Sequence, residues 1–344
     1  MMLGACAHRR SVEAPAPAVE VLPVEQTSGT RALLQSVSAV DENVVWIGGH
    51  RATWVRTVDG GATWQSGKMT GADSTLEFRD VYAVSATTAY LLSAGNGPAS
   101  RIYKTTDAGA TWQLEFMNRD SSAFFDCFDF WDADHGVAVS DAVNGKLIVI
   151  TTADGGGHWD RVPNESLPPA LAGEGAYAAS GTCVVARGRA DAWIGTGAVS
   201  GARVYHTTDR GRSWSVIRTP IVSGNFAGIG SLVFTDPRNG FALGGRLLDS
   251  LDRSDSAVAV THDGGVTWSV LARPTFSGAI YGGAIAGGVL VAVGPKGLDY
   301  SIDGAQHWRG LAGAAYWSVG AYGNSAWAVG PGGRITRLVI VHHN

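Results

Sequence analysis

Acidic residues gather in one short stretch of the chain, and they offer its clearest potential for chemistry. The segment FDCFDFWDAD, residues 125–134, contains Asp126, Asp129, Asp132 and Asp134. Another carboxylate, Glu174, lies in a long connecting segment, residues 162–177. Glycoside cleavage needs two carboxyl groups at a defined separation. Asp126 and Glu174 are therefore a candidate catalytic pair, although such carboxylates also cap strands, pair with arginine or line a water-filled channel.

A second set of charged residues occurs where strands are expected to begin or to turn, and these are candidate binding residues. Arg79, Asp80 and Asp129 lie on or beside predicted innermost strands, while Arg51 and Asp141 follow predicted second strands. Neither a metal nor a cofactor is expected. The histidines are scattered, no Cys/His cluster has ligand spacing, and there is no Walker-type loop or nucleophile elbow.

The overall composition argues against several functional classes. The 344 residues carry 26 Lys and Arg against 30 Asp and Glu. A net charge of −4 argues against a general nucleic-acid or anionic-membrane surface. The chain has no run of apolar residues long enough to predict a membrane-spanning helix. The 47 glycines and 12 tryptophans indicate many tight turns and large aromatic contacts, and helical periodicity is nearly absent.

The elements that position these side chains are indicated by a phrase that occurs six times. Its copies read TVDGGATW, TTDAGATW, TADGGGHW, TTDRGRSW, THDGGVTW and SIDGAQHW. A period in the forties that carries a turn signal and an aromatic residue is typical of propeller blades. The aspartates of the six copies are Asp59, Asp107, Asp154, Asp209, Asp263 and Asp303.

Each repeat reads as four short strands, so the chain predicts an all-β, seven-bladed propeller over residues 18–344. In the second unit the strands are expected at 78–84, 89–95, 101–106 and 112–116. The last unit lacks its fourth strand, and the segment AVEVLPVE, residues 18–25, is available to supply it. Because ring closure removes an exposed sheet edge, we expect this N-terminal strand to complete the last blade.

The repeated phrase is expected to be structural. It falls on the hairpin between the third and fourth strands, where the aspartate accepts backbone N–H groups and glycine permits the left-handed conformation. Ligands are then expected on the other face, which holds the loops from second to third strands and from one blade to the next. Two of these loops, residues 162–177 and 244–257, are long, and long loops often carry function.

Together with inner strands such as FRDVYAV and AYLLSAG, the phrase resembles the Asp-box, or BNR repeat. The chain thereby resembles the photosystem II assembly factor-like family, which is related to sialidases, over nearly its whole length. The resemblance implies a seven-bladed propeller but no single activity, because sialidases, xyloglucan-active endoglucanases and sortilin-like receptors share the repeat. The Arg-Ile-Pro motif of sialidases is absent; the nearest match is Phe78-Arg79-Asp80.

The N-terminus, residues 1–17, is predicted to be a lipoprotein-like segment and linker. Leu3-Gly4-Ala5-Cys6 resembles the end of a bacterial lipoprotein signal, in which the cysteine becomes lipidated. The basic and apolar regions that normally precede it are missing, as a start codon placed too late would explain. The alternative is a chance tetrapeptide on a disordered tail. A lipid anchor at Cys6 predicts a location on the periplasmic side of the bacterial envelope.

The two remaining cysteines, Cys127 and Cys183, occupy equivalent places on neighbouring inner strands. Because such strands spread apart, buried free thiols are expected, with pairing in an oxidising compartment as the alternative.

Taken together, these features favour a monomeric, non-enzymatic envelope protein that binds a protein partner or a glycan, as a scaffold or assembly factor. One alternative is a glycoside hydrolase or lyase that uses Asp126 and Glu174. Another is a photosystem II assembly or stability factor.

Overall fold

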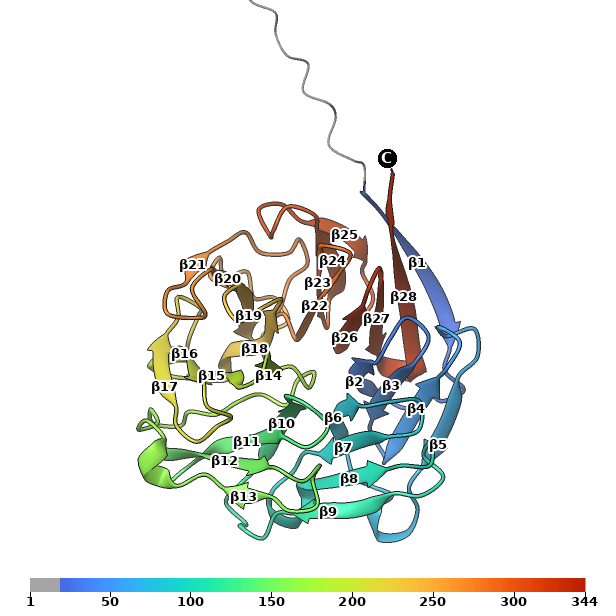
Figure 1. Ribbon diagram of the computed structural model, residues 1–344. Coiled ribbons are helices and arrows are strands. Elements are labelled where there is room, and N and C mark those ends of the chain that lie inside the picture. The colour runs from blue at the N-terminus through green and yellow to red at the C-terminus, as the bar shows by residue number, and fades with distance from the viewer. Residues whose placement is uncertain (1–18, 344) are drawn as a thin grey trace, which may run out of the picture.

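Seven four-stranded antiparallel sheets stand in a ring around a central axis (Figure 1). The computed structural model describes residues 19–343, so the predicted lipidation site at Cys6 and the linker lie outside the described residues. Short β-branched and aromatic runs form the strands, and glycine-rich turns separate them. The prediction of an all-β, seven-bladed propeller is confirmed.

The first three blades follow one another along the chain, with the innermost strand first in each. Blade 1 comprises β2 (Leu34–Ala39), β3 (Val45–Gly49), β4 (Thr53–Thr57) and β5 (Gln65–Lys68). Blade 2 comprises β6 (Phe78–Ala83), β7 (Ala89–Ser93), β8 (Arg101–Thr105) and β9 (Gln113–Met117). Blade 3 comprises β10 (Phe125–Phe130), β11 (Gly136–Val143), β12 (Lys146–Thr152) and β13 (Asp160–Arg161).

The next three blades repeat the same order. Blade 4 comprises β14 (Val184–Arg187), β15 (Asp191–Ala198), β16 (Gly201–Thr207) and β17 (Ser215–Arg218). Blade 5 comprises β18 (Ala227–Phe234), β19 (Gly240–Arg246), β20 (Val258–Thr261) and β21 (Ser269–Val270). Blade 6 comprises β22 (Gly282–Ala286), β23 (Val289–Gly294), β24 (Gly297–Ser301) and β25 (Arg309–Ala312). Four single 3₁₀ turns, at Gly71–Asp73, Gly97–Ala99, Asn164–Ser166 and Pro331–Gly333, interrupt the loops.

Blade 7 is built from both ends of the chain. It comprises β26 (Ser318–Tyr322), β27 (Ser325–Gly330), β28 (Arg334–His342) and, on its outer edge, β1 (Val19–Thr27). Strand β1 pairs antiparallel with β28 in register from Val19 opposite His342 to Thr27 opposite Arg334, and Figure 1 shows the two strands side by side. The predicted closing strand is therefore confirmed.

The apolar core is divided into seven clusters, each shared by two neighbouring blades. Trp46, Trp193 and Trp327 are fully buried in these interfaces. Trp193 of blade 4 stacks on Phe234 of blade 5, with ring centroids 3.9 Å apart. Because every blade is covered on both faces by its neighbours, stability depends on the closed ring.

The six repeated turns share one hydrogen-bond network, which the turn from β4 to β5 illustrates. Asp59 Oδ1 accepts the hydroxyl of Thr57 at 2.7 Å and the backbone N–H of Thr63 at 2.9 Å, while Oδ2 accepts the Thr63 hydroxyl. Gly60 and Gly61 are both left-handed, with φ of 70° and 87°. The local bonding is the one that turn chemistry predicts.

Sequence differences between the copies are absorbed without changing the turn. In the third and sixth copies, Nδ1 of His158 and His307 takes the place of the threonine hydroxyl, at 2.6 and 2.7 Å from the aspartate. In the sixth copy Ala305 adopts φ 68° where the other copies have glycine. The hydrogen bonds of the turn therefore tolerate a strained residue at this position.

Strand alternation sorts the loops between two faces. The turn face holds the six repeated turns and the connections between first and second strands. The loop face holds the connections between second and third strands and those between blades.

Candidate functional site

The structure separates the seven predicted site residues into three places. Arg51 lines a basic cleft beside blade 1. Asp80 and Asp129 line an axial channel bounded by all seven innermost strands. Arg79, Asp126, Asp141 and Glu174 are brought together in an acidic cleft on the loop face between blades 3, 4 and 5.

The loop-face end of the axis is filled by the chain itself. Residues 178–182, here called the axial segment, precede β14 and bind the inner strands of distant blades. Gln35 Nε2 of blade 1 donates to Ala178 O at 2.9 Å, and Ser318 Oγ of blade 7 donates to Ser180 O at 2.8 Å. Thr182 Oγ1 donates to Ser231 Oγ of blade 5 at 2.7 Å. The end of the long connector therefore crosses the axis on the face where ligands were expected.

A disulfide joins the residue that follows this segment, Cys183, to Cys127 of blade 3, and the expectation of free thiols at these positions is wrong. The two Cα atoms are 5.9 Å apart, within the range that a disulfide requires. The expectation assumed that both cysteines lie on regular inner strands. Cys183 instead lies just before β14, on the chain returning from the axis, and this path brings it to Cys127 on β10.

In the axial channel, of about 500 Å³, the two predicted carboxylates join neighbouring blades. Asp80 Oδ2 accepts the N–H of Phe128 at 2.8 Å, linking β6 to β10. Asp129 Oδ2 accepts the N–H of Ala186 at 2.8 Å, linking β10 to β14. Burial raises the pKa of both carboxyl groups. Their hydrogen bonds hold inner strands together, which is the strand-capping alternative considered from the sequence.

Glu174 is fully engaged by protein groups. Its carboxylate forms an ion pair with Arg203, whose Nε donates to Oε1 at 2.9 Å. It also accepts hydrogen bonds from the hydroxyls of Thr196 at 2.7 Å and Tyr205 at 3.1 Å, and from the N–H of Leu171 at 2.7 Å. Its side chain has no exposed surface. A carboxylate with every oxygen occupied is suited to holding the connector in place rather than to transferring protons.

Asp126 pairs with Asp141 instead of with Glu174. The two residues come from the adjacent strands β10 and β11 and line the same cleft, and burial is the main cause that raises the pKa of each, that of Asp141 to about 6. Asp126 Oδ1 accepts the N–H of Ala178 at 3.1 Å, while its buried Oδ2 receives no N–H or hydroxyl donor from the described residues. Adjacent buried carboxyl groups hold a proton between them because both cannot easily ionise.

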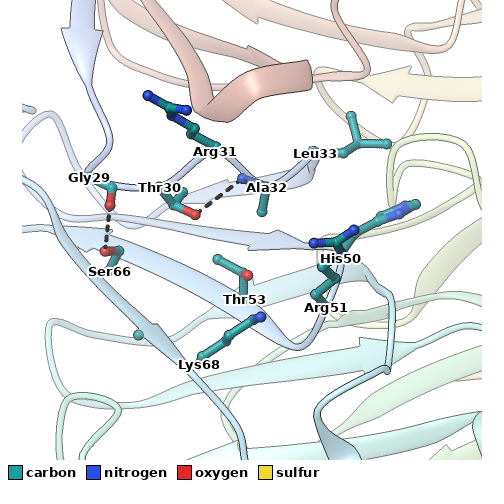
Figure 2. A pocket seen from close by; sticks show the side chains of 11 residues that line it. Gly29, Thr30, Arg31, Ala32, Leu33, His50, Arg51, Thr53, Ser66 and Lys68 are labelled. Atoms are coloured by element: carbon teal, nitrogen blue, oxygen red, sulfur yellow. Dashed lines mark hydrogen bonds between the residues drawn. The ribbon is translucent and has the colours of Figure 1, made fainter.

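The basic cleft encloses about 760 Å³ and carries an excess of positive charge. Figure 2 shows Arg31, from the connection between β1 and β2, across the cleft from Lys68 at the end of β5. Arg51 lies in the turn between β3 and β4, next to His50 (Figure 2). Arg31, Arg51 and Lys68 are exposed, and none takes part in an ion pair within residues 19–343.

Arg51 lies at the rim of the basic cleft and has a strained backbone conformation. Arg51 and Ala52 are both left-handed, with φ of 56° and 53°. Such pairs strongly favour asparagine and glycine, as at Asn144 and Gly145 between β11 and β12. A strained backbone with no local reason in its sequence often marks a functional position.

The basic and acidic clefts share a wall. His50 Nε2 lies 2.5 Å from Gln35 Oε1, and Gln35 donates to Ala178 O in the acidic cleft. His50 Nδ1 lies 3.5 Å from Glu77, which accepts two hydrogen bonds from Arg79 of the acidic cleft. Burial lowers the pKa of His50, despite the opposing effect of Glu77. Two clefts of opposite charge therefore lie next to each other on one face.

Sequence reasoning missed several residues of these clefts. Arg31, His50 and Lys68 carry no motif, and they meet only because the β1 connection folds beside blade 1. Arg203 lies in a strand of blade 4 and Tyr177 in the connector before it, and nothing in the sequence distinguishes them from ordinary strand and loop residues. The dipeptide Arg51-Ala52 in a short turn was the one available signal, because these residues disfavour a left-handed pair.

Neither a metal-binding group nor a membrane-spanning helix is found among the described residues. Among residues 19–343, no group of three or more His, Cys, Asp or Glu side chains is placed to hold a metal ion. In the same part of the chain, no helix is long and apolar enough to cross a membrane.

No protein-family model and no curated protein sequence matches the chain. YCF48 from Cyanidioschyzon merolae is 15% identical, with a TM-score of 0.65 over 92% of this chain and 98% of that one. YCF48 bound to D1 peptide is 16% identical, with a TM-score of 0.61 over 93% and 96%. Virginiamycin B lyase from Staphylococcus aureus is 12% identical, with a TM-score of 0.63 over 94% and 100%. At these identities the likeness shows the seven-bladed propeller fold alone.

Proposed function

We propose that this propeller is a non-catalytic scaffold that binds an acidic segment of a partner protein in the basic cleft. The observation that carries the proposal is the set of three exposed cations, Arg31, Arg51 and Lys68, around one concave surface. Exposed cations without protein partners attract and orient carboxylates through charge-assisted hydrogen bonds. The strained turn that presents Arg51 is further support.

The comparisons are consistent with this proposal without identifying the partner. A propeller of the same fold, YCF48, has been solved with a D1 peptide bound. A photosystem II assembly role for this chain, which the sequence resemblance implies, would be a special case in which the acidic segment belongs to such a partner. Glycan binding, the other possibility from the sequence, finds less support because no Phe, Tyr or Trp is among the described residues that line the basic cleft.

The glycoside hydrolase alternative receives less support than protein binding. It required Asp126 and Glu174 to act as acid and base on one substrate. The carboxylate of Glu174 is instead saturated by Arg203 and three further donors, and Asp126 faces Asp141.

We also propose a location outside the cytoplasm, on the periplasmic side of the envelope, with a lipid anchor at Cys6. The disulfide between Cys127 and Cys183 supports this proposal, because disulfides form and persist in oxidising compartments. Mass spectrometry of the mature N-terminus tests the anchor, and an unmodified Cys6 would refute it.

Binding of fluorescent acidic and basic peptides of equal length, measured by anisotropy, tests the proposed function. The triple variant R31A/R51A/K68A should lose about ten- to a hundredfold in affinity for the acidic peptide. A matched control, R189A/R212A/R238A, removes three exposed arginines of the turn face and should bind like the wild type. Equal losses in the two variants, or no preference for the acidic peptide, would contradict the proposal.

A further inference from the structure

The acidic cleft has a net negative charge that the rest of its wall does not cancel. The cleft encloses about 500 Å³. Within its wall, Glu174 is paired with Arg203, and Arg79 is paired with Glu77 through two hydrogen bonds of 3.0 and 2.6 Å. These pairs are neutral overall. The uncompensated charge therefore belongs to the carboxyl pair of Asp126 and Asp141.

Asp126 supplies an independent sign that a ligand group is missing. Its side chain is buried, with 2% of the residue exposed, yet Oδ2 receives no N–H or hydroxyl donor from the described residues. Buried carboxylate oxygens normally have a donor, since leaving one without a partner is costly. Next to the Asp141 carboxyl group, this oxygen offers a position for a proton or, more favourably, for a positively charged donor.

The rim of the same cleft is apolar and exposed. Val199, in the turn between β15 and β16, is 69% exposed, and Phe226, just before β18, is 54% exposed. Phe226 is held in the left-handed conformation with φ 50°, which is rare for an aromatic residue. A buried charge beneath an apolar rim matches an amphipathic cation, whose aliphatic part covers the rim while its charge reaches inward.

We propose that the acidic cleft binds an aliphatic primary ammonium group, as found on a lysine side chain or a free alkylamine. The ammonium would replace the shared proton between Asp126 and Asp141, and the alkyl chain would lie along Val199 and Phe226. The inference rests on this cleft alone and does not depend on the function proposed for the basic cleft.

The binding should strengthen as the pH rises, because the carboxyl pair loses its bound proton and becomes more negative. Burial raises the pKa of Asp141 to about 6 and that of Asp126 as well. The other groups that face the pair are Arg79, Tyr177 and the Glu174–Arg203 ion pair. Burial raises the pKa of Tyr177 to about 12, so its phenol stays neutral. A cation competes with the proton, and acid conditions therefore oppose binding.

Isothermal titration calorimetry with n-pentylammonium and with Nα-acetyl-lysine methylamide tests the inference on the whole protein. Both should bind more weakly at about pH 5 than at about pH 8, by on the order of tenfold. Asp141→Asn should weaken binding at the higher pH by a similar factor and remove most of the pH dependence. The basic-cleft variant R51A/K68A should bind both amines like the wild type.

A second variant separates a lost site from a damaged fold. V199S/F226S changes only exposed rim residues. It should weaken binding of n-pentylammonium, whose alkyl chain covers the rim, and leave binding of methylammonium unchanged. Binding of n-pentylammonium without acetyl-lysine methylamide would identify a free amine as the ligand, and binding of both would support a lysine side chain. No response to either amine, or equal binding by Asp141→Asn, would overturn the inference.

Discussion

At the scale of single residues, Arg51 on the loop face has a backbone conformation that its residue type disfavours. Arg51 occupies a left-handed conformation that costs a non-glycine residue about 1–2 kcal/mol. Asn144 occupies the corresponding conformation in the turn between β11 and β12, where asparagine is well tolerated. The two turns thus provide a test and its matched control within one molecule.

Arg51→Asn is predicted to raise the free energy of unfolding by about 0.5–1 kcal/mol, because asparagine adopts the left-handed conformation more easily. Asn144→Arg should lower the free energy of unfolding by a similar amount. Urea denaturation monitored by tryptophan fluorescence measures both. Arg51→Asn should also weaken binding of the acidic peptide, whereas Asn144→Arg should leave that binding unchanged. Changes of the same sign in the two variants would contradict the strain argument.

At the scale of elements, the connector from β13 to β14 does the most to shape the loop face. Its carboxylate Glu174 is held by Arg203, and its axial segment is bound to the inner strands of several blades. The disulfide at Cys183 fixes the end of that path. The connector also forms part of the wall of the acidic cleft, which is lined by Ala176, Tyr177 and Ala178.

Removal of the disulfide is predicted to lower stability substantially. The cross-link spans a sequence separation of 56 residues, and loop-closure entropy for such a loop corresponds to about 4 kcal/mol. C127A/C183A should therefore unfold at lower urea concentration than the wild type. Both cysteines are fully buried, so a reductant should act on the wild type only once it unfolds. Wild-type protein that titrates two free thiols at these positions when denatured without reductant would refute the bond.

The elements differ in how far their sequence could reveal them. Blades repeat because local turn chemistry at Asp59 and its five equivalents recurs, so periodicity was sufficient to predict the ring and its closing strand. The axial segment has no repeat and no hydrophobic pattern, and its path depends on hydrogen bonds to Gln35 and Ser318, far away in sequence. The disulfide follows from that path, whereas the proximity of Asp126 and Asp141 depends on register shifts in β10 and β11 of blade 3, so neither was predictable from local pattern.

At the scale of the whole molecule, the six repeated turns should make the ring sensitive to acid. Hydrogen bonds from the turn lower the pKa of Asp59, Asp154, Asp263 and Asp303 to about 2. A carboxyl group with a lowered pKa in the folded state stabilises it fully above the unfolded pKa, and this contribution is lost as the pH falls from about 4 to about 2.

The urea midpoint is therefore predicted to fall steeply within that window. The buried carboxyl groups with raised pKa act in the opposite direction and mainly above the pKa of the unfolded chain, at about 4, so they contribute little as the pH falls further. Asp303→Asn should make the fall less steep than in the wild type, measured by urea titrations at several pH values. An unchanged slope would show that the turns do not govern acid unfolding.

Closure of the ring is a property of the whole molecule that one strand controls. Strand β1 pairs with β28 along its length, buries Val21 in the interface between blades 6 and 7, and reaches blade 1 through Gln26. Gln26 Nε2 donates to Gly60 O at 3.1 Å, and Gln26 Oε1 accepts the indole N–H of Trp64 at 3.2 Å. The closing strand therefore joins the last blade to the first.

Deletion of residues 1–27 is predicted to lower the melting temperature by on the order of 10 °C or more, since it exposes the edge of β28 and opens contacts across two interfaces. Deletion of residues 1–17 alone should leave the melting temperature unchanged and serves as the control. A synthetic peptide of residues 19–27, added to the shorter protein, should restore part of the loss in proportion to its concentration, because the strand is held by non-covalent pairing. Equal melting temperatures for the two deletions would show that the ring is stable without its closing strand.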